Sequence, residues 1–287
     1  MSTDDPHYVT TAVDGAVVES WKTGDGRYHL RTGGLPNEII TYPNGTIRKS
    51  WREADGTYSQ AGGRHNHEVV EPDSILKCWL SPEGWMATDR HLHNAEIIKI
   101  GSVERSWRTP EGKYSERGEL HNREIESVGP FRTIMRSWLT PEGQFSQREQ
   151  HNNELEKDDG TVDESWRTPE GEWAECTDRH NREVHWPNGT KTKIWTAADG
   201  RVVLRPGGAS NQISVWPDGT CRMFWIDPNG SYTTRDGNQP NQVTVMPDGH
   251  VVNVWRLPDG TVTGQSPTES AIRKREAQPD TKRARTF

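Results

Sequence analysis

The chain has 287 residues and a formal net charge of −7 at pH 7. Leu, Ile, Val and Phe make up only about 16% of it, a share typical of disordered chains, but its 13 Trp are of a residue type that such chains lack. We therefore expect a folded chain whose core depends on aromatic side chains. No apolar run approaches the ~18 residues of a membrane span and no secretory signal is visible, so the expected setting is cytoplasmic, with specialised export left open.

After a lead-in over residues 1–13, residues 14–264 are predicted to form a tandem repeat. Its mark is a Trp that recurs every 28 to 31 residues, followed five residues later by Gly. The series comprises Trp21, Trp51, Trp79, Trp107, Trp138, Trp166, Trp195, Trp225 and Trp255. In its fullest form, WRTPEG, the Pro, the acidic residue and the Gly suit successive positions of a tight turn, which predicts a β-hairpin.

A second turn lies between the first ones and reads PNG or PDG, as in YPNGT from Tyr42 and WPDGT from Trp216. The segment from this turn to the next Trp alternates between two kinds of residue, for example Ile47, Lys49 and Trp51 against Arg48 and Ser50. A period of two predicts a half-buried strand and excludes a helix.

Each of eight units also carries one Asn, followed by Glu or Gln and then by an apolar residue. These are Asn37, Asn66, Asn94, Asn122, Asn152, Asn181, Asn211 and Asn241. We predict that this Asn forms a corner of the chain, because Asn tolerates left-handed backbone conformations.

A unit of about 29 residues cannot bury its own apolar face, so the units must stack on one another. We therefore predict an all-β fold of about eight β-hairpin repeats in an open single-layer roll or solenoid, with the nine Trp as a structural ladder in a shared interior. The alternative is a closed β-propeller, whose blades usually need ~40 or more residues. Residues 265–287 are predicted to be a basic tail, with a short helix beginning at SPTE (residues 266–269) and disorder beyond it.

The pattern of Trp, PDG or PNG turns and a His before a polar corner resembles the MORN-type and tryptophan–glycine hairpin repeats of bacteria, phages and large viruses. More distantly it is similar to the YD repeats of Rhs proteins. The likeness covers residues 14–264, and it implies a binding or scaffolding role without chemistry of its own.

Two groups of side chains are candidate binding residues. The first comprises aromatic residues outside the Trp ladder, at turn edges where they could hold a ligand or partner: Tyr42, Trp85, Trp173, Trp186 and Trp216. The second comprises the histidines that precede the corner Asn in five units: His65, His93, His121, His151 and His180. With units stacked about 4.8 Å apart, these histidines and the glutamates that follow them would form columns able to bind metal or respond to pH. The alternative, which we favour, is a structural role at the corner, so no metal site and no cofactor are predicted.

Known catalytic motifs are absent from the sequence, and no catalytic residue is predicted. The negative charge of the repeat region disfavours nucleic acid as a partner. We therefore expect a non-enzymatic repeat protein that binds another protein or assembles with copies of itself, and no membrane association. The alternative is a carbohydrate-binding module that uses the aromatic residues at turn edges, and a third possibility is an enzyme with a site near residues 129–135, where the repeat spacing is longest.

Overall fold

The computed structural model describes residues 8–60, 64–88, 92–175, 179–236 and 239–268. Regular structure in these ranges is β-strand, joined by tight turns and by short 3-10 turns such as Thr32–Gly34 and Pro206–Gly208. The predicted all-β class is therefore confirmed. The chain divides into two compact units. Unit 1 comprises Met1–Ser146 and Asn152–Asp158, and unit 2 comprises Gln147–His151 and Asp159–Phe287.

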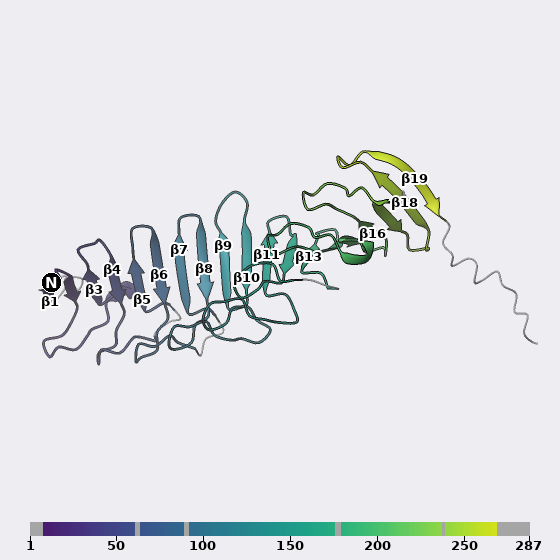
Figure 1. Cartoon of the computed structure of the whole chain (residues 1–287). Helices are drawn as coiled ribbons and strands as arrows, with labels where there is room; N and C mark the ends of the chain where they lie inside the picture. The colour runs from purple at the N-terminus through teal and green to yellow at the C-terminus, as the bar shows by residue number, and fades with distance from the viewer. Residues whose placement is uncertain (1–7, 61–63, 89–91, 176–178, 237–238, 269–287) are drawn as a thin grey trace, which may run out of the picture. The chain divides into compact units, whose positions relative to one another are not determined.

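Unit 1 is a single sheet in which each antiparallel strand pairs with the strand before it and the strand after it (Figure 1). Its strands are β1 (Tyr8–Thr11), β2 (Val17–Ser20), β3 (Glu38–Thr41), β4 (Ile47–Ser50), β5 (His67–Val70), β6 (Ser74–Cys78), β7 (Ala95–Lys99), β8 (Ser102–Ser106), β9 (Arg123–Ser127), β10 (Thr133–Ser137) and β11 (Asn153–Lys157). The sheet does not break into separate blades, so the predicted open single-layer arrangement is confirmed and the propeller alternative does not describe it.

Unit 2 repeats this arrangement, again with antiparallel strands paired in chain order. Its strands are β12 (Val162–Ser165), β13 (Arg182–His185), β14 (Lys191–Ile194), β15 (Gln212–Val215), β16 (Cys221–Phe224), β17 (Gln242–Val245), β18 (Val251–Arg256) and β19 (Val262–Thr268).

The strands extend beyond the predicted repeat region at both ends. Strand β1 lies within the predicted lead-in, residues 1–13, and pairs with β2. Strand β19 runs through Ser266, so the helix start predicted there is wrong. The backbone of this segment instead pairs with β18 along its length. The rest of the predicted tail, residues 269–287, lies outside the described residues.

Each repeat has two kinds of turn, at opposite ends of its strands. After each ladder Trp the chain forms a small hairpin closed by one bridge, such as Arg52 with Tyr58. Its Gly has a positive φ, 90° at Gly56, and donates a backbone hydrogen bond to the residue three positions earlier. The PNG turns have the same form, with the Gly45 amide bonded to the Tyr42 carbonyl at 3.0 Å. Both predicted turns are confirmed.

The corner Asn is a buried connector between chain segments. Asn94 is 3% exposed, and its Nδ2 donates to the carbonyls of Ala87 and Arg108, both at 2.7 Å. Its Oδ1 accepts from the backbone amide of Arg108 at 2.7 Å. The same three bonds recur at Asn37, Asn66, Asn122, Asn181, Asn211 and Asn241. The Asn therefore joins the Trp hairpin of its own repeat to the start of the next one.

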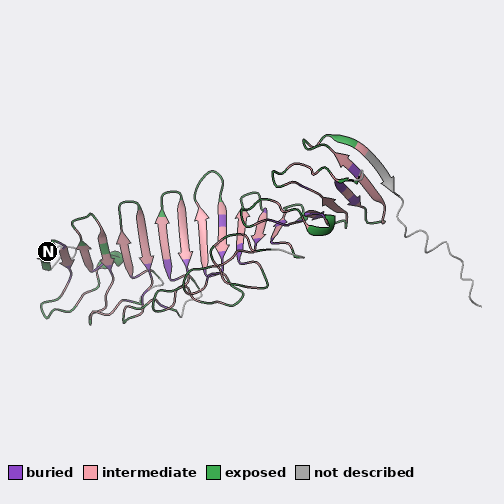
Figure 2. Ribbon diagram, in the orientation of Figure 1, coloured by how far each residue is buried: buried purple, intermediate pink, exposed green. Residues whose placement is uncertain are grey.

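Most buried residues lie at the ends of the strands near the Trp hairpins (Figure 2), with a few, such as Ile134 and Thr190, elsewhere. Trp21, Trp138 and Trp195 are less than 10% exposed, and the other ladder Trp are half-buried. The strands themselves are mostly half-buried on both faces. Because the sheet is a single layer, each repeat depends on its two neighbours for burial.

Candidate functional site

Alternate side chains along each strand lie on opposite faces of the sheet, and one face of unit 1 carries a row of alternating charge, which we call the charged face. In cross-strand order its central row reads Lys49, Glu68, Lys77, Glu96, Arg105, Glu124, Arg136 and Glu154. Neighbours form ion pairs, for example Lys49 with Glu68 at 2.7 Å and Arg105 with Glu124 at 3.1 Å. The charges on this face are therefore neutralised within the chain.

The opposite face of unit 1, which we call its aromatic face, carries an aliphatic row between aromatic side chains. The aliphatic residues lie in register on β5, β6, β7, β9 and β10 and are half-buried: Val69, Leu76, Ile97, Ile125 and Met135. On β8 the same register position is Glu104, between Ile97 and Ile125. Tyr58 contacts His67 on β5, with ring centroids 5.9 Å apart, and the Tyr114 hydroxyl donates to Glu104 on β8 at 3.5 Å. At the PNG end, Arg48 lies over the ring of the predicted binding residue Tyr42.

Unit 2 has its own aromatic face, on which three of the predicted binding residues lie. Trp186 donates from Nε1 to the Thr192 hydroxyl at 3.0 Å, and Arg222 lies 4.9 Å from the ring centre of Trp216. At the other end of the strands, Trp173 lies beneath the guanidinium of Arg182.

Trp85 lies apart from these residues. It is 58% exposed in its Trp hairpin and lines a cavity of about 290 Å³ with Met86, Pro82 and Pro110. The structure therefore brings Trp173, Trp186 and Trp216 onto one face of unit 2 and places Tyr42 on the aromatic face of unit 1, but it does not gather all the predicted aromatic residues into one pocket.

The predicted histidines lie between successive ladder Trp and not against one another. His93 makes edge-to-face contacts with Trp79 and Trp107, with ring centroids 5.1 and 6.1 Å apart. His65, His121 and His180 each lie between two Trp in the same way. The expected spacing of 4.8 Å between units is wrong, because each repeat contributes two strands. The resulting gap of about 9.6 Å admits a second ring.

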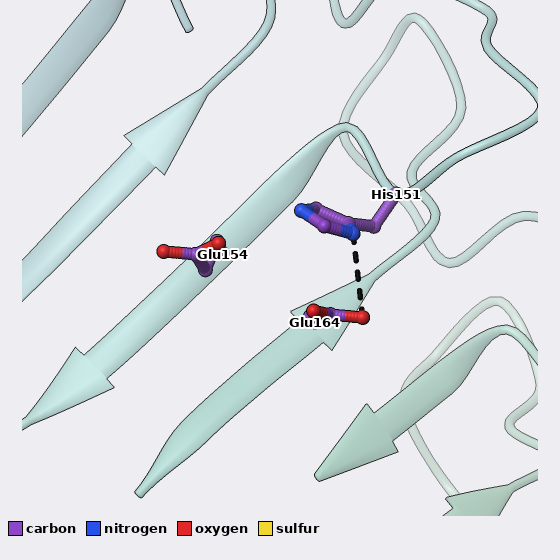
Figure 3. A group of neighbouring side chains, drawn as sticks. All are labelled: His151, Glu154 and Glu164. Atoms are coloured by element: carbon purple, nitrogen blue, oxygen red, sulfur yellow. Dashed lines mark ion pairs between the residues drawn. The ribbon is translucent and has the colours of Figure 1, made fainter. Parts of the chain in front are cut away.

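Four of the five histidines pair with the glutamate three positions later in the chain. The distances from His Nε2 to a carboxylate oxygen are 3.1 Å for His65, 3.6 Å for His93 and His121, and 2.8 Å for His180. His151 pairs through Nδ1 with Glu164, on the following strand β12, at 3.3 Å (Figure 3). Burial lowers the pKa of His65, His121 and His180 below its usual value of 6.5, so these rings are neutral at pH 7.

Sequence reasoning missed a set of Arg residues that lie over ladder Trp rings in the repeats without His. Arg31, Arg205 and Arg235 lie over Trp21, Trp195 and Trp225, with the guanidinium carbon 3.8 to 4.1 Å from the ring centre. Each also donates to a backbone carbonyl next to the corner Asn. The signal was available, because each of these Arg follows its Trp by ten residues.

The alternating rings of the ladder Trp and the corner His, which we call the Trp–His column, border two cavities. One of about 540 Å³ lies in unit 1, between Trp51, His65, Leu35 and Arg64. Another of about 510 Å³ lies in unit 2, between Trp166, His180 and Glu183. Among the described residues, no helix is long and apolar enough to cross a membrane.

No family model and no curated protein matches this chain. Among solved structures it is similar to the TCP10 domain of CPAP from Danio rerio, with 14% identity over 92% of this chain and 100% of that one, and a TM-score of 0.42. The TCP domain of SAS-4 (dCPAP) from Drosophila melanogaster, solved in complex with a proline-rich motif of Ana2 (dSTIL), matches at 15% identity over 85% and 86% of the two chains, with a TM-score of 0.25. A TcdB2-TccC3-TEV structure matches at 10% identity over 91% of this chain and 12% of that one, with a TM-score of 0.19. The resemblance to MORN-type, tryptophan–glycine and YD repeats stays a prediction.

Proposed function

We propose that this chain is a protein-binding scaffold and that the aromatic face of unit 1 is its docking surface. The observation that supports this most is the row of half-buried aliphatic residues on β5, β6, β7, β9 and β10, which is bordered by Tyr58 and Tyr114. Its one carboxylate, Glu104 on β8, is paired with Arg123. Interfaces between proteins use such surfaces, with aromatic residues enriched and charged residues depleted at their centre. On the charged face, by contrast, carboxylates and cations already satisfy one another.

Two adjacent residues of β7 provide a matched test. Ile97 lies on the aromatic face and Ile98 on the charged face, and both are half-buried. A photo-cross-linking amino acid is placed at each position in the full chain, and cross-linked products are identified by mass spectrometry. We expect defined products from position 97, competed by excess unlabelled chain, and few from position 98. Equal labelling at both positions, or labelling that unlabelled chain does not compete, would contradict the proposal.

Ile97→Glu and Ile98→Glu then separate binding from folding. We expect Ile97→Glu to lower the affinity for the cross-linked partner at least about tenfold, because a charge would be desolvated at the centre of the interface. Ile98→Glu lies on the opposite face, between Ile75 and Val103 in the cross-strand register, and should bind as the unmodified chain does. If the cross-linked partner is a second copy of the chain, sedimentation velocity will show self-association that Ile97→Glu abolishes.

A carbohydrate-binding role is the second candidate, and it rests on unit 2. Trp186 is 45% exposed beside the hydroxyls of Thr192 and Ser214, so a ring for stacking lies next to hydrogen-bonding groups. Glycan-array binding that Trp186→Ala and Trp216→Ala abolish, with the far-UV circular dichroism unchanged, would favour this role. If no glycan on the array binds the chain, the carbohydrate-binding role is excluded.

A further inference from the structure

The cavity of about 540 Å³ in unit 1 lies apart from the proposed docking surface, since none of its lining residues belongs to the aliphatic row. It is formed by the corner segments of two successive repeats, and its volume is in the range of pockets that hold one small molecule. The lining side chains that would determine its ligand are Leu30, Leu35, Trp51, His65, Arg31 and Arg64.

Two leucines and a Trp give this cavity an apolar wall. Leu30 is 60% exposed and Leu35 is 43% exposed, so both side chains are accessible to a ligand. Trp51 is fixed in orientation, because its Nε1 donates to the Gly34 carbonyl at 2.8 Å and its ring contacts that of His65 with centroids 5.1 Å apart. The cavity therefore offers a preformed surface to an apolar group.

The charge in the same cavity is positive. Among the described residues two arginines line it and no carboxylate does. Arg31 is held in place, with its guanidinium carbon 3.8 Å from the ring centre of Trp21 and its Nη1 donating to the Pro36 carbonyl at 2.9 Å. Arg64 lies against the backbone of Gly34, where a Cβ would be 2.8 Å from its Nη1. A guanidinium beside an apolar wall suits a ligand that is both anionic and apolar.

The cavity of unit 2 occupies the same place in the repeat but has a different charge. Trp166 and His180 line it where Trp51 and His65 line the cavity of unit 1. Its walls contain no leucine among the described residues, and they include three glutamates: Glu149, Glu175 and Glu183. These carboxylates would repel an anion, so the chain itself contains a matched cavity that should not take the same ligand.

We propose that the cavity of unit 1 binds an amphipathic organic anion. Its apolar body would lie against Leu30, Leu35 and Trp51, and its carboxylate or sulfonate group would pair with Arg64. Aliphatic and aromatic acids share this chemistry. The site is independent of the proposed scaffold function, and the sequence-based expectations did not include it.

The test is calorimetric titration of the full chain with two acids, naphthoate and octanoate, and with their neutral counterparts, naphthamide and octanol. We expect one anion to bind per chain with a dissociation constant of about 100 μM or lower. The neutral counterpart should bind at least about tenfold more weakly, because it cannot form a charge-assisted pair with a guanidinium. Tighter binding of either acid supports the proposal and shows whether the ligand is aromatic or aliphatic. The proposal is overturned if neither acid binds at millimolar concentration, or if acids and neutral counterparts bind equally.

Arg64→Gln should weaken binding of the acid at least about tenfold and leave binding of the neutral counterpart unchanged. Arg179→Gln is the matched control, because Arg179 precedes His180 as Arg64 precedes His65, and it lines the cavity of unit 2. We expect this control to bind the acid as the unmodified chain does, and equal losses in the two variants would also overturn the proposal. Leu35→Asp places a carboxylate in the cavity at an exposed position and should abolish binding of the acid. It provides a second variant if Arg64→Gln does not fold, as judged by far-UV circular dichroism.

Discussion

At the scale of single residues, the corner Asn does more than form the turn that the sequence pattern predicts for it. Its amide satisfies two carbonyls and one backbone amide that would otherwise be buried without partners. The pattern predicts which Asn matters, because it recurs once per unit. It could not predict why, since the two segments that the side chain joins are 7 and 14 residues away and meet only in the folded chain.

We therefore expect Asn94→Ala to lower the free energy of unfolding by about 3 kcal/mol, because it leaves three buried backbone groups without partners. Asn44→Ala is the control. Asn44 is exposed and accepts one hydrogen bond, from the Thr46 amide, so its loss should cost less than about 1 kcal/mol. Urea unfolding followed by Trp fluorescence measures both, and equal destabilisation would contradict the connecting role of Asn94.

At the scale of elements, successive turns contact one another along the sheet. A Cβ added to Gly189 would lie 2.8 Å from Cγ of Pro217 in the next turn, and the φ of Gly189 is +81°. Gly230 has a similar φ, +87°, with open space where a Cβ would be.

Gly230→Ala should therefore cost about 1–2 kcal/mol from backbone strain alone. Gly189→Ala should cost clearly more, because the ring of Pro217 must also move. Chemical denaturation of the two variants gives the difference directly. Equal losses would show that the contact between turns contributes nothing to stability.

The buried histidines should also make stability depend on pH. Burial, with help from Arg48 and Arg52, lowers the pKa of His67 to about 4, and burial also lowers the pKa of His65, His121 and His180. In the unfolded chain these groups titrate near 6.5. Between pH 6.5 and about 4 the unfolded chain therefore binds more protons than the folded chain, and stability falls as the pH is lowered.

We expect the thermal midpoint to be constant from pH 8 to 7 and to fall from pH 6.5 to 5, measured at constant ionic strength with a chelator present. His67→Gln should reduce this slope. A midpoint that rises toward pH 5 would be inconsistent with neutral, buried histidines.

At the scale of the whole molecule, the sequence predicts the class and the open stack well, because turn chemistry and Trp spacing are local signals repeated many times. It predicts the boundaries and the site less well. The pairing of β19 with β18 overrides a plausible helix start at Ser266, and the cavity of unit 1 is formed by corner segments of two successive repeats that meet only in the folded chain. The position of His between two Trp rings depends on the spacing of the repeats, because two strands per repeat leave room for a second ring.

Repeat architecture makes a whole unit removable. Deletion of residues 79–106, one complete period, would place Lys77 opposite Glu124, where Arg105 stands in the intact chain. We expect a folded chain with unchanged circular dichroism per residue and a modestly lower denaturation midpoint, since stability is set by contacts between neighbouring repeats. Deletion of residues 79–101 removes β7 together with the turns on both sides of it, so β6 would run directly into β8. It should abolish cooperative unfolding of unit 1.

The equivalence of the repeats also has a consequence for how the chain reaches its native state. A strand that pairs one complete repeat out of place still turns the same side chains to each face of the sheet, and its Trp and His still meet equivalent neighbours. The free-energy cost of such mispairing is therefore small. The unequal period of 28 to 31 residues, and the lack of a His before the corner Asn in the repeats at either end of the series, make the repeats distinguishable. These differences between the repeats therefore disfavour pairing that is out of register, and they favour pairing of each strand with its native neighbour.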